Sequence, residues 1–302
     1  MSAIDYNFLI NQIQRNLPTL PTIVNELTNI LQNPDSSTFA VEEVMTSDQT
    51  MTMKILRVAN TSFYRGGRDE RVTDANEAIG SLGFEKIRNV ILTTSVFKMF
   101  KEESAENRFS LEELWKHSLG VAAASRNLAN WLGKPWHERA YTCGLVHDIG
   151  KVARYKLDEV DQETFFLADS QLALDKKINF FKAELVNQSP RHDYLGYLIC
   201  KNWGLSKFVE GVVRWHHEPN PEARQKVMSE EAGEVIDLVI LANWAVNHLK
   251  FGFSGHETPD HPSDALLQRL NLSSEYIDKI LESISAELEL TNEFCSMLDS
   301  DS

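Results

Sequence analysis

The stretch "SLEELWKHSLGVAAASRNLANWLGKP", residues 110–135, carries the signals that decide the fold class. Ser110 is a favourable N-cap residue, and Glu113 completes the Ser-x-x-Glu pattern that stabilises the first turn of a helix. Gly133 and Pro135 provide the stop, because glycine readily adopts the left-handed conformation after a helix and proline cannot continue one. The stretch therefore predicts one long helix.

Helical start and stop signals of this kind recur along the chain. A helix is predicted from Ser189 to Gly204, and Ser206 is predicted to cap another helix that ends before Pro219. The segment "SSEYIDKILESISAELEL", residues 273–290, spaces isoleucine and leucine at the helical period. No segment shows convincing strand alternation of apolar and polar residues, so the chain is predicted to be all-α.

Composition and charge restrict the possible partners. The 302 residues are 42% hydrophobic and 25% charged, and the formal net charge of −14 disfavours binding to nucleic acid or to an anionic membrane. No apolar run of about 18 residues, the length needed to cross a bilayer, is present. Cys143, Cys200 and Cys295 lie far apart and form no Cys-x-x-Cys pair, which indicates reduced thiols. We expect a cytoplasmic protein that binds neither nucleic acid nor membrane.

Two polar segments indicate how the chain is organised. "KEESAENR", residues 101–108, predicts a boundary between an N-terminal helical block, residues 1–108, and a second helical block with a C-terminal extension, residues 109–302. The first block is expected to pack on the second. "GFSGHETPDHPSD", residues 252–264, is predicted to be a surface loop.

Histidines form the most informative pattern in the second block. Five of the nine fall in segments that are far apart in sequence, with apolar helical neighbours: His117, His147, His192, His216 and His217. Any one of them alone is most simply a hydrogen-bonded core histidine. An unpaired buried polar group, however, costs about 1–3 kcal/mol, so five buried imidazoles all need partners. We therefore predict that they converge on a shared metal, or on a hydrogen-bonded cluster that includes Asp148.

Asp148 directly follows His147 and adds a carboxylate to this set. Mixed imidazole and carboxylate ligands suit Fe, Mn, Ni or Zn, and the thiols are not arranged for a softer site. Lys151 lies three residues after Asp148, where it either pairs with that carboxylate or binds a substrate phosphate. The remaining histidines lie in polar or loop-like surroundings and have no predicted role: His137, His248, His256 and His261.

Several motifs together carry a resemblance to a known family. "GLVHDIGK", residues 144–151, with His117 upstream and His192 and "HHE" (216–218) downstream, resembles the HD superfamily of metal-dependent phosphohydrolases. The N-terminal motifs are similar to those of the HDOD family within it: "LPTLP" (17–21), "DQTMTMKILRVANTS" (48–62) and "AIGSLG" (78–83). The match runs from about Leu17 to about Pro219 and keeps the family's motifs in order.

The resemblance implies an all-helical bacterial protein of a family generally regarded as regulatory, many of whose members have lost metal ligands. It places the superfamily's metal ligands at His117, His147, Asp148, His192, His216 and His217. The last ligand of that pattern is an aspartate on a later helix, where "VILANWAV" (239–246) has Asn243, and Asp237 is the other candidate. If Asn243 stands there, Asp148 is the only carboxylate, and we expect one divalent ion or none.

Two functions are compatible with these residues. The first is an HDOD-type signalling protein that binds a partner protein or a small ligand, its histidine–aspartate cluster having a structural or ligand-sensing role. The alternative is a metal-dependent phosphohydrolase acting on a nucleotide or a phosphomonoester, in which Asp148 and Lys151 would be catalytic. The missing carboxylate favours the first. "PNPEARQ", residues 219–225, lacks the Gly-Tyr-Pro signature of cyclic-dinucleotide hydrolases, so that activity is not expected.

Overall fold

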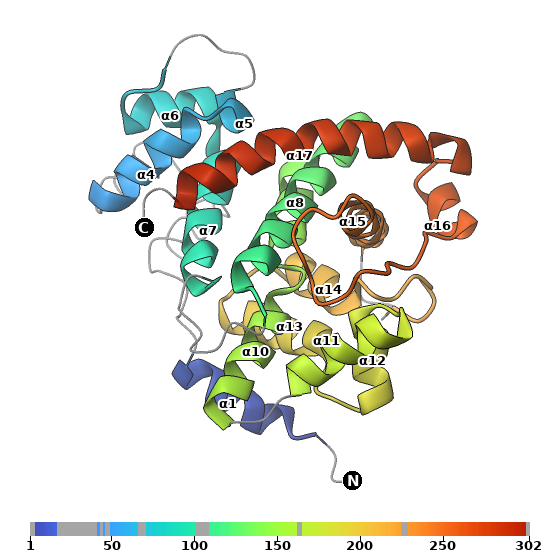
Figure 1. Ribbon diagram of the computed structural model, residues 1–302. Coiled ribbons are helices and arrows are strands. Elements are labelled where there is room, and N and C mark those ends of the chain that lie inside the picture. Colours follow the sequence, from blue (N-terminus) through green and yellow to red (C-terminus); the bar gives the residue numbers. More distant parts are fainter. Residues whose placement is uncertain are drawn as a thin grey trace. The chain divides into compact units, whose positions relative to one another are not determined.

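The architecture is known for most of the chain from a computed structural model. It describes residues 4–16, 41–42, 45, 49–65, 71–100, 109–161, 165–224 and 229–299. Every regular element among these residues is a helix, which confirms the all-α prediction (Figure 1). The contacts divide the chain into two units, Met1–Pro18 with Met99–Leu288 and Thr19–Lys98 with Glu289–Ser302.

The first unit contains every predicted site residue. Its helices are α1 (Tyr6–Asn16), α8 (Leu111–Trp131), α9 (His137–Val146), α10 (Ile149–Asp161), α11 (Phe165–Lys176), α12 (Phe180–Asn187), α13 (His192–Asn202), α14 (Lys207–Trp215), α15 (Glu230–His248), α16 (Asp264–Arg269), the short 3-10 helix η1 (Ser274–Tyr276) and α17 (Ile277–Asp299) up to Leu288. The predicted boundary after Arg108 falls outside the described residues, so the division into blocks 1–108 and 109–302 stays a prediction.

The second unit is built from the segments that carry two of the N-terminal motifs. Its helices are α4 (Gln49–Ala59), α5 (Ser62–Arg65), α6 (Ala75–Leu82), α7 (Phe84–Phe100) up to Lys98, and the end of α17 from Glu289. The side chain of Asn60 accepts a hydrogen bond from the Val72 N–H at 2.8 Å and donates one to the Val72 carbonyl at 2.7 Å, which ties the end of α4 to the segment before α6. Phe63 stacks on Phe294 at 5.5 Å between ring centroids. The "LPTLP" motif lies outside the described residues.

The helix ends follow the predicted caps closely, with one exception. The Ser110 hydroxyl accepts a hydrogen bond from the Glu113 N–H, and the Ser206 hydroxyl accepts one from Val209 N–H, so both caps are confirmed. The predicted start of a helix at Ser189 is wrong, because α13 begins at His192. The N-cap residue is Arg191, without a side-chain cap hydrogen bond, and the Ser189 hydroxyl donates to the Asp169 carboxylate at 3.0 Å.

Two glycines allow the helices around the site to approach closely. A Cβ on Gly144, in α9, would lie 2.7 Å from the Val121 carbonyl oxygen of α8. A Cβ on Gly150, in α10, would lie 1.9 Å from the His192 carbonyl oxygen at the start of α13. Backbone atoms cannot move aside as a flexible side chain can. These two glycines therefore permit the backbone approaches between the helices that carry the candidate site.

Gly150→Ala is expected to destabilise the first unit by more than the about 1–3 kcal/mol usual for overpacking, because its Cβ meets backbone. Denaturant unfolding followed by tryptophan fluorescence measures this, since every tryptophan lies in the first unit: Trp115, Trp131, Trp136, Trp203, Trp215 and Trp244. Gly233→Ala, on α15, is the matched control because its Cβ meets nothing within 4 Å. Equal stability of the two variants would contradict the packing argument.

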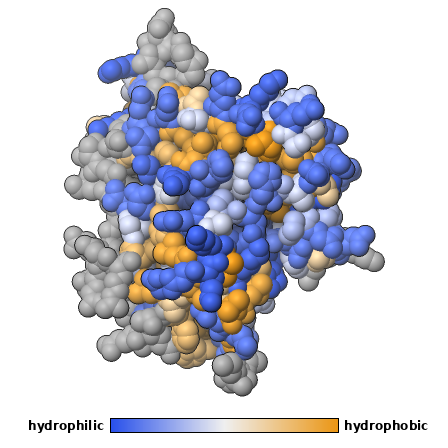
Figure 2. Space-filling model, turned by 45° about the vertical axis from the view of Figure 1, so that its right-hand side comes forward, coloured by the Kyte–Doolittle hydropathy of each residue, from blue (hydrophilic) through white to orange (hydrophobic). Residues whose placement is uncertain are grey.

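The surface shows no single dominant apolar region on the face seen in Figure 2, where hydrophilic and hydrophobic residues are interspersed. Large exposed apolar side chains such as Phe8, Trp131 and Val186 belong to different helices, and scattered residues of this kind are normal on a protein surface. Within the described part of the chain, no helix is both long and apolar enough to cross a membrane.

Candidate metal centre

The structure brings all six residues that the resemblance places in a metal site into one cluster around Asp148. His117 comes from α8, and His147 and Asp148 form the junction between α9 and α10. His192 begins α13, and His216 and His217 directly follow α14. Their ligand atoms form two groups within 4.8 Å, His117–His147–Asp148 and Asp148–His192–His216–His217. Asp148 belongs to both groups, so these residues could hold a metal ion.

Asp148 presents both carboxylate oxygens to the surrounding imidazoles. Its Oδ2 lies 3.3 Å from Nε2 of His147 and 3.8 Å from Nε2 of His117. Its Oδ1 lies 3.2 Å from Nε2 of His192 and 3.5 Å from Nε2 of His216. These side chains are fully buried, so bulk water does not reach their polar atoms.

Backbone hydrogen bonds orient two of these imidazoles. His147 Nδ1 donates to the Gly144 carbonyl, and His216 Nδ1 donates to the Val213 carbonyl, each at 2.7 Å. In a neutral ring, Nε2 then carries a lone pair, and in both residues it points toward the oxygens of Asp148.

Lone pairs of nitrogen and oxygen therefore face one another inside a buried site. Nε2 of His117, His147 and His216 and Oδ1 of Asp148 have no hydrogen-bond partner among the described residues. Buried polar atoms without partners are costly, and a cation placed among them would satisfy several at once. Because these buried atoms have no partners in the described part of the chain, the residues present are suited to bind a metal ion.

Electrostatics favour neutral rings at three of the cluster histidines and an ionised Asp148. Burial lowers the pKa of His216 to about 4 and holds the pKa values of His117 and His217 well below the usual range. Burial alone would raise the pKa of Asp148, but the nearby His147 and Lys151 outweigh it and hold that pKa well below its usual range. Neutral imidazoles beside an ionised carboxylate are the forms that bind metal.

His192 differs from the other cluster histidines because it bridges two carboxylates. Its Nδ1 lies 2.8 Å from Oε2 of the buried Glu184, and its Nε2 faces Asp148 and lies 2.9 Å from Nε2 of His217. Burial lowers the pKa of His192, but Glu184 and Asp148 outweigh it and raise that pKa above its usual value. A carboxylate behind a histidine is the arrangement that commonly orients metal ligands.

Sequence reasoning missed the buried charged residues that lie behind His192, which are Glu184, Arg154 and Asp169. Glu184 on α12 also accepts a hydrogen bond from Arg154 at 2.6 Å, and Arg154 donates to Asp169 on α11, again at 2.6 Å. All three side chains are buried. In the sequence, each looks like an ordinary charge on a helix surface, because its partner lies on another helix.

Lys151 takes one of the two predicted roles. Its Nζ lies 2.7 Å from Oδ2 of Asp148, and the side chain is almost completely buried. The ammonium group also lies 5.0 Å from the ring centroid of Phe180. The ion pair with Asp148 is therefore present, whereas contact with a phosphate stays a prediction.

Asn243, and not Asp237, lies beside the cluster. Asp237 receives hydrogen bonds from Arg224 and Arg269, both at 2.6 Å, and its carboxylate is committed to that pairing. Asn243 lines a cavity of about 420 Å³ together with His216 and His217. Among the described residues, Asp148 is thus the only carboxylate in the two groups of candidate metal ligands.

His256 lines the same cavity, although the sequence indicated no role for it. It lies in the loop between α15 and α16, as predicted for residues 252–264, but this part of the loop is buried and only 5% of His256 is exposed. The surrounding polar residues of "SGHETPDH" hid this burial from sequence reasoning.

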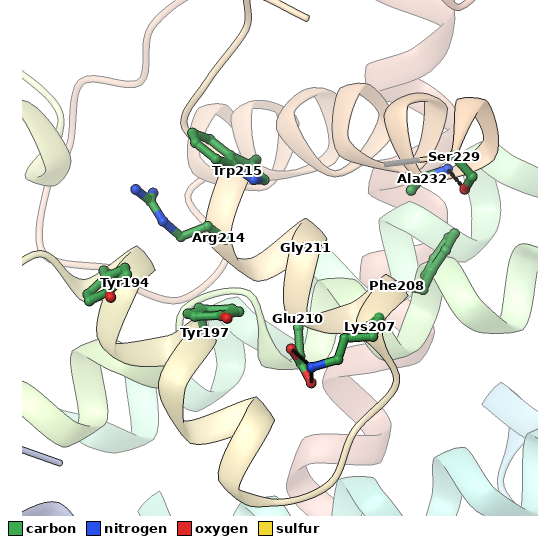
Figure 3. A pocket seen from close by; sticks show the side chains of 10 residues that line it. All are labelled: Tyr194, Tyr197, Lys207, Phe208, Glu210, Gly211, Arg214, Trp215, Ser229 and Ala232. Atoms are coloured by element: carbon green, nitrogen blue, oxygen red, sulfur yellow. Dashed lines mark hydrogen bonds and ion pairs between the residues drawn. The ribbon is translucent and has the colours of Figure 1, made fainter. Parts of the chain in front are cut away.

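A second cavity, of about 560 Å³, contains none of the predicted site residues (Figure 3). It is lined from α13, α14 and the start of α15 by Tyr194, Tyr197, Lys207, Phe208, Glu210, Gly211, Arg214, Trp215, Ser229 and Ala232. Lys207 pairs with Glu210 at 2.9 Å, and the Arg214 guanidinium lies 4.4 Å from the Trp215 ring centroid. This cavity is separate from the one beside the histidine cluster.

Sequence comparison identifies the domain but not its activity. The family model for the HDOD domain matches residues 17–219. A curated, uncharacterized protein from Treponema pallidum (strain Nichols) is 21% identical over 234 residues, which make up 77% of this chain and 42% of that protein. The chain thus spans less than half the length of the curated relative that it matches.

Solved structures share the fold. An HDOD domain protein of unknown function from Geobacter sulfurreducens has a TM-score of 0.72 at 27% identity, with 94% of this chain and 97% of that chain covered. A candidate signal transduction protein from Marinobacter aquaeolei VT8 has a TM-score of 0.69 at 16% identity, covering 97% and 66%. A candidate metal-dependent phosphohydrolase from Shewanella amazonensis SB2B has a TM-score of 0.60 at 21% identity, covering 94% and 97%. The two more distant likenesses show the fold alone.

Proposed function

Because the chain belongs to the HDOD domain family, we propose that it is a bacterial, cytoplasmic signal-transduction protein whose buried cluster holds one divalent transition metal and senses a small anionic ligand. The observation that carries this proposal is the set of buried, unpartnered atoms, Nε2 of His117, His147 and His216 and Oδ1 of Asp148. The affinity of a partner protein would then depend on whether the first unit has bound this ligand.

The donor set supports one ion more readily than two. Asp148 supplies the single carboxylate, and it already pairs with Lys151. A second divalent ion would add charge that no further carboxylate offsets. Fe, Mn, Ni and Zn all accept imidazole and carboxylate ligands, so the donor set does not select among these four.

The charge of the loaded site indicates the kind of ligand. Lys151 offsets the charge of Asp148, so an added divalent ion leaves the centre net positive. The adjoining cavity of about 420 Å³ is large enough for a small molecule, and Asn243, His216 and His217 line it. An anion such as a phosphate group is the complementary ligand, and the metal would supply Lewis acidity toward its oxygen.

The alternative, a phosphohydrolase acting on a nucleotide or a phosphomonoester, is supported by the near-complete histidine set. Its proposed catalytic residues are Asp148 and Lys151. The two are paired with each other at 2.7 Å, and Asp148 is also enclosed by imidazoles. Lys151 is held in the ion pair, and the pKa of Asp148 lies well below its usual range, so both are poor general acids or bases, which favours binding without turnover.

Phosphate binding and phosphate ester hydrolysis distinguish the two functions. With Mn²⁺ supplied, we expect calorimetry to show binding of inorganic phosphate that disappears without the metal. Hydrolysis of p-nitrophenyl phosphate should stay at the level of His147→Ala/His216→Ala. A metal-dependent hydrolysis rate well above that of this variant would establish the phosphohydrolase instead. A metal-loaded protein that does not bind phosphate would contradict the proposed sensing of anions.

A further inference from the structure

A chain of hydrogen bonds connects Asn243 to the buried His256. The Asn247 amide nitrogen donates to the Asn243 backbone carbonyl at 2.9 Å and to Asn243 Oδ1 at 2.7 Å. The Ser254 hydroxyl donates to Asn247 Oδ1 at 3.0 Å. Ser254 Oγ also lies 3.3 Å from His256 Nδ1. The chain links α15 to the loop that follows it.

The direction of each hydrogen bond in this chain follows from its first member. A backbone carbonyl only accepts, so the atom of Asn247 that faces the Asn243 carbonyl must be its NH₂ group, and the opposite atom is its oxygen. That oxygen takes the single hydroxyl proton of Ser254. Ser254 Oγ can then only accept from His256, which places the imidazole proton on Nδ1 and leaves Nε2 as an acceptor.

The surroundings of His256 keep its ring neutral. Burial, together with the charge of Lys151, lowers the pKa of His256 to about 3. The residue lines the cavity of about 420 Å³ that adjoins the cluster. Other polar groups on that wall include the amides of Asn243 and Asn247.

We propose that His256 is the residue of this cavity that selects ligands carrying a hydroxyl or amino donor in addition to their anionic group. The inference rests on the proposed function, because it assumes that the cavity takes an anionic ligand. The anion is attracted by the metal and Lys151, and His256 Nε2 accepts the hydrogen bond from the second group. His256 is thereby a specificity residue of the same site.

The tautomer can be tested without any ligand. Long-range ¹H–¹⁵N spectra of the full chain should show His256 protonated on Nδ1, with Nε2 unprotonated. Ser254→Ala removes the acceptor of that proton, so we expect a mixture of the two tautomers in this variant. A His256 ring that is protonated on Nε2 in the native protein would overturn the inference.

Selectivity is tested with two probes of equal carbon length, glycerol 3-phosphate and propyl phosphate, titrated into the Mn²⁺-supplemented protein. One hydrogen bond to His256 should favour glycerol 3-phosphate by about three- to tenfold. His256→Leu should abolish this preference while retaining the affinity for propyl phosphate. His248→Leu, an exposed histidine at the end of α15 that does not line the cavity, is the control and should keep the preference.

The outcomes distinguish a failure of the proposed function from a failure of the role of His256. Failure of the metal-loaded protein to bind either probe would count against the proposed function. Equal binding of both probes, or a preference that survives in His256→Leu, would overturn the role of His256 and leave the anion site intact.

Discussion

His147→Ala/His216→Ala should lose the divalent ion that we expect the wild-type protein to hold at about one per chain, with affinity reduced more than about 100-fold. Both substitutions remove an Nε2 lone pair that faces Asp148. They leave the ion pair of Asp148 with Lys151 in place, whereas substituting Asp148 would strand a buried ammonium group. Elemental analysis of protein prepared without chelator, after supplementation with Mn, Fe, Ni or Zn, measures the ion.

One control variant and one variant expected to bind the metal more tightly make this result specific. His137→Ala changes a half-buried histidine outside the cluster and should retain the ion. Asn243→Asp adds a carboxylate to the cavity wall beside His216, and the added charge should strengthen metal binding by about tenfold or more. Wild-type protein that contains no metal under any supplementation would contradict the metal centre, as would a double variant that keeps its ion.

Features with a local cause were predictable from the sequence. Ser110, Glu113 and Ser206 act within a few residues of themselves, so pattern alone located the helix starts. The histidines were predictable as a set because buried imidazoles need partners, and five of them were unlikely to find five separate solutions. The structure brings those five histidines together with Asp148.

Features that depend on contacts between distant segments were not predictable in the same way. Glu184 becomes buried only because Arg154 and His192 reach it from other helices. The loop residue His256 is buried because Ser254 and Asn247 hold it against α15, and no periodic pattern marks such a position. Ser189 resembled a helix cap in sequence, but α13 begins only at His192, and the Ser189 hydroxyl donates to Asp169 on α11.

The buried ion pairs of Arg154 with Glu184 and Asp169, behind His192, should also contribute much of the stability of the first unit. Arg154→Ala is expected to lower the free energy of unfolding by about 3–5 kcal/mol, the range found when one member of a buried charge group is removed. The two carboxylates that Arg154 joins, Glu184 and Asp169, would remain buried without their cation. Denaturant unfolding followed by tryptophan fluorescence reports on this unit.

Lys182→Ala provides the matched comparison. Lys182 pairs with Asp260 at the same distance of 2.6 Å, but both side chains are about half exposed, so its loss should cost no more than about 1 kcal/mol. Arg154→Lys keeps the charge but not the two-pronged geometry, and its stability should fall between those of Arg154→Ala and the wild type. If Arg154→Ala loses no more stability than Lys182→Ala, the buried charges behind His192 do not hold α10, α11 and α12 together, and packing alone must do so.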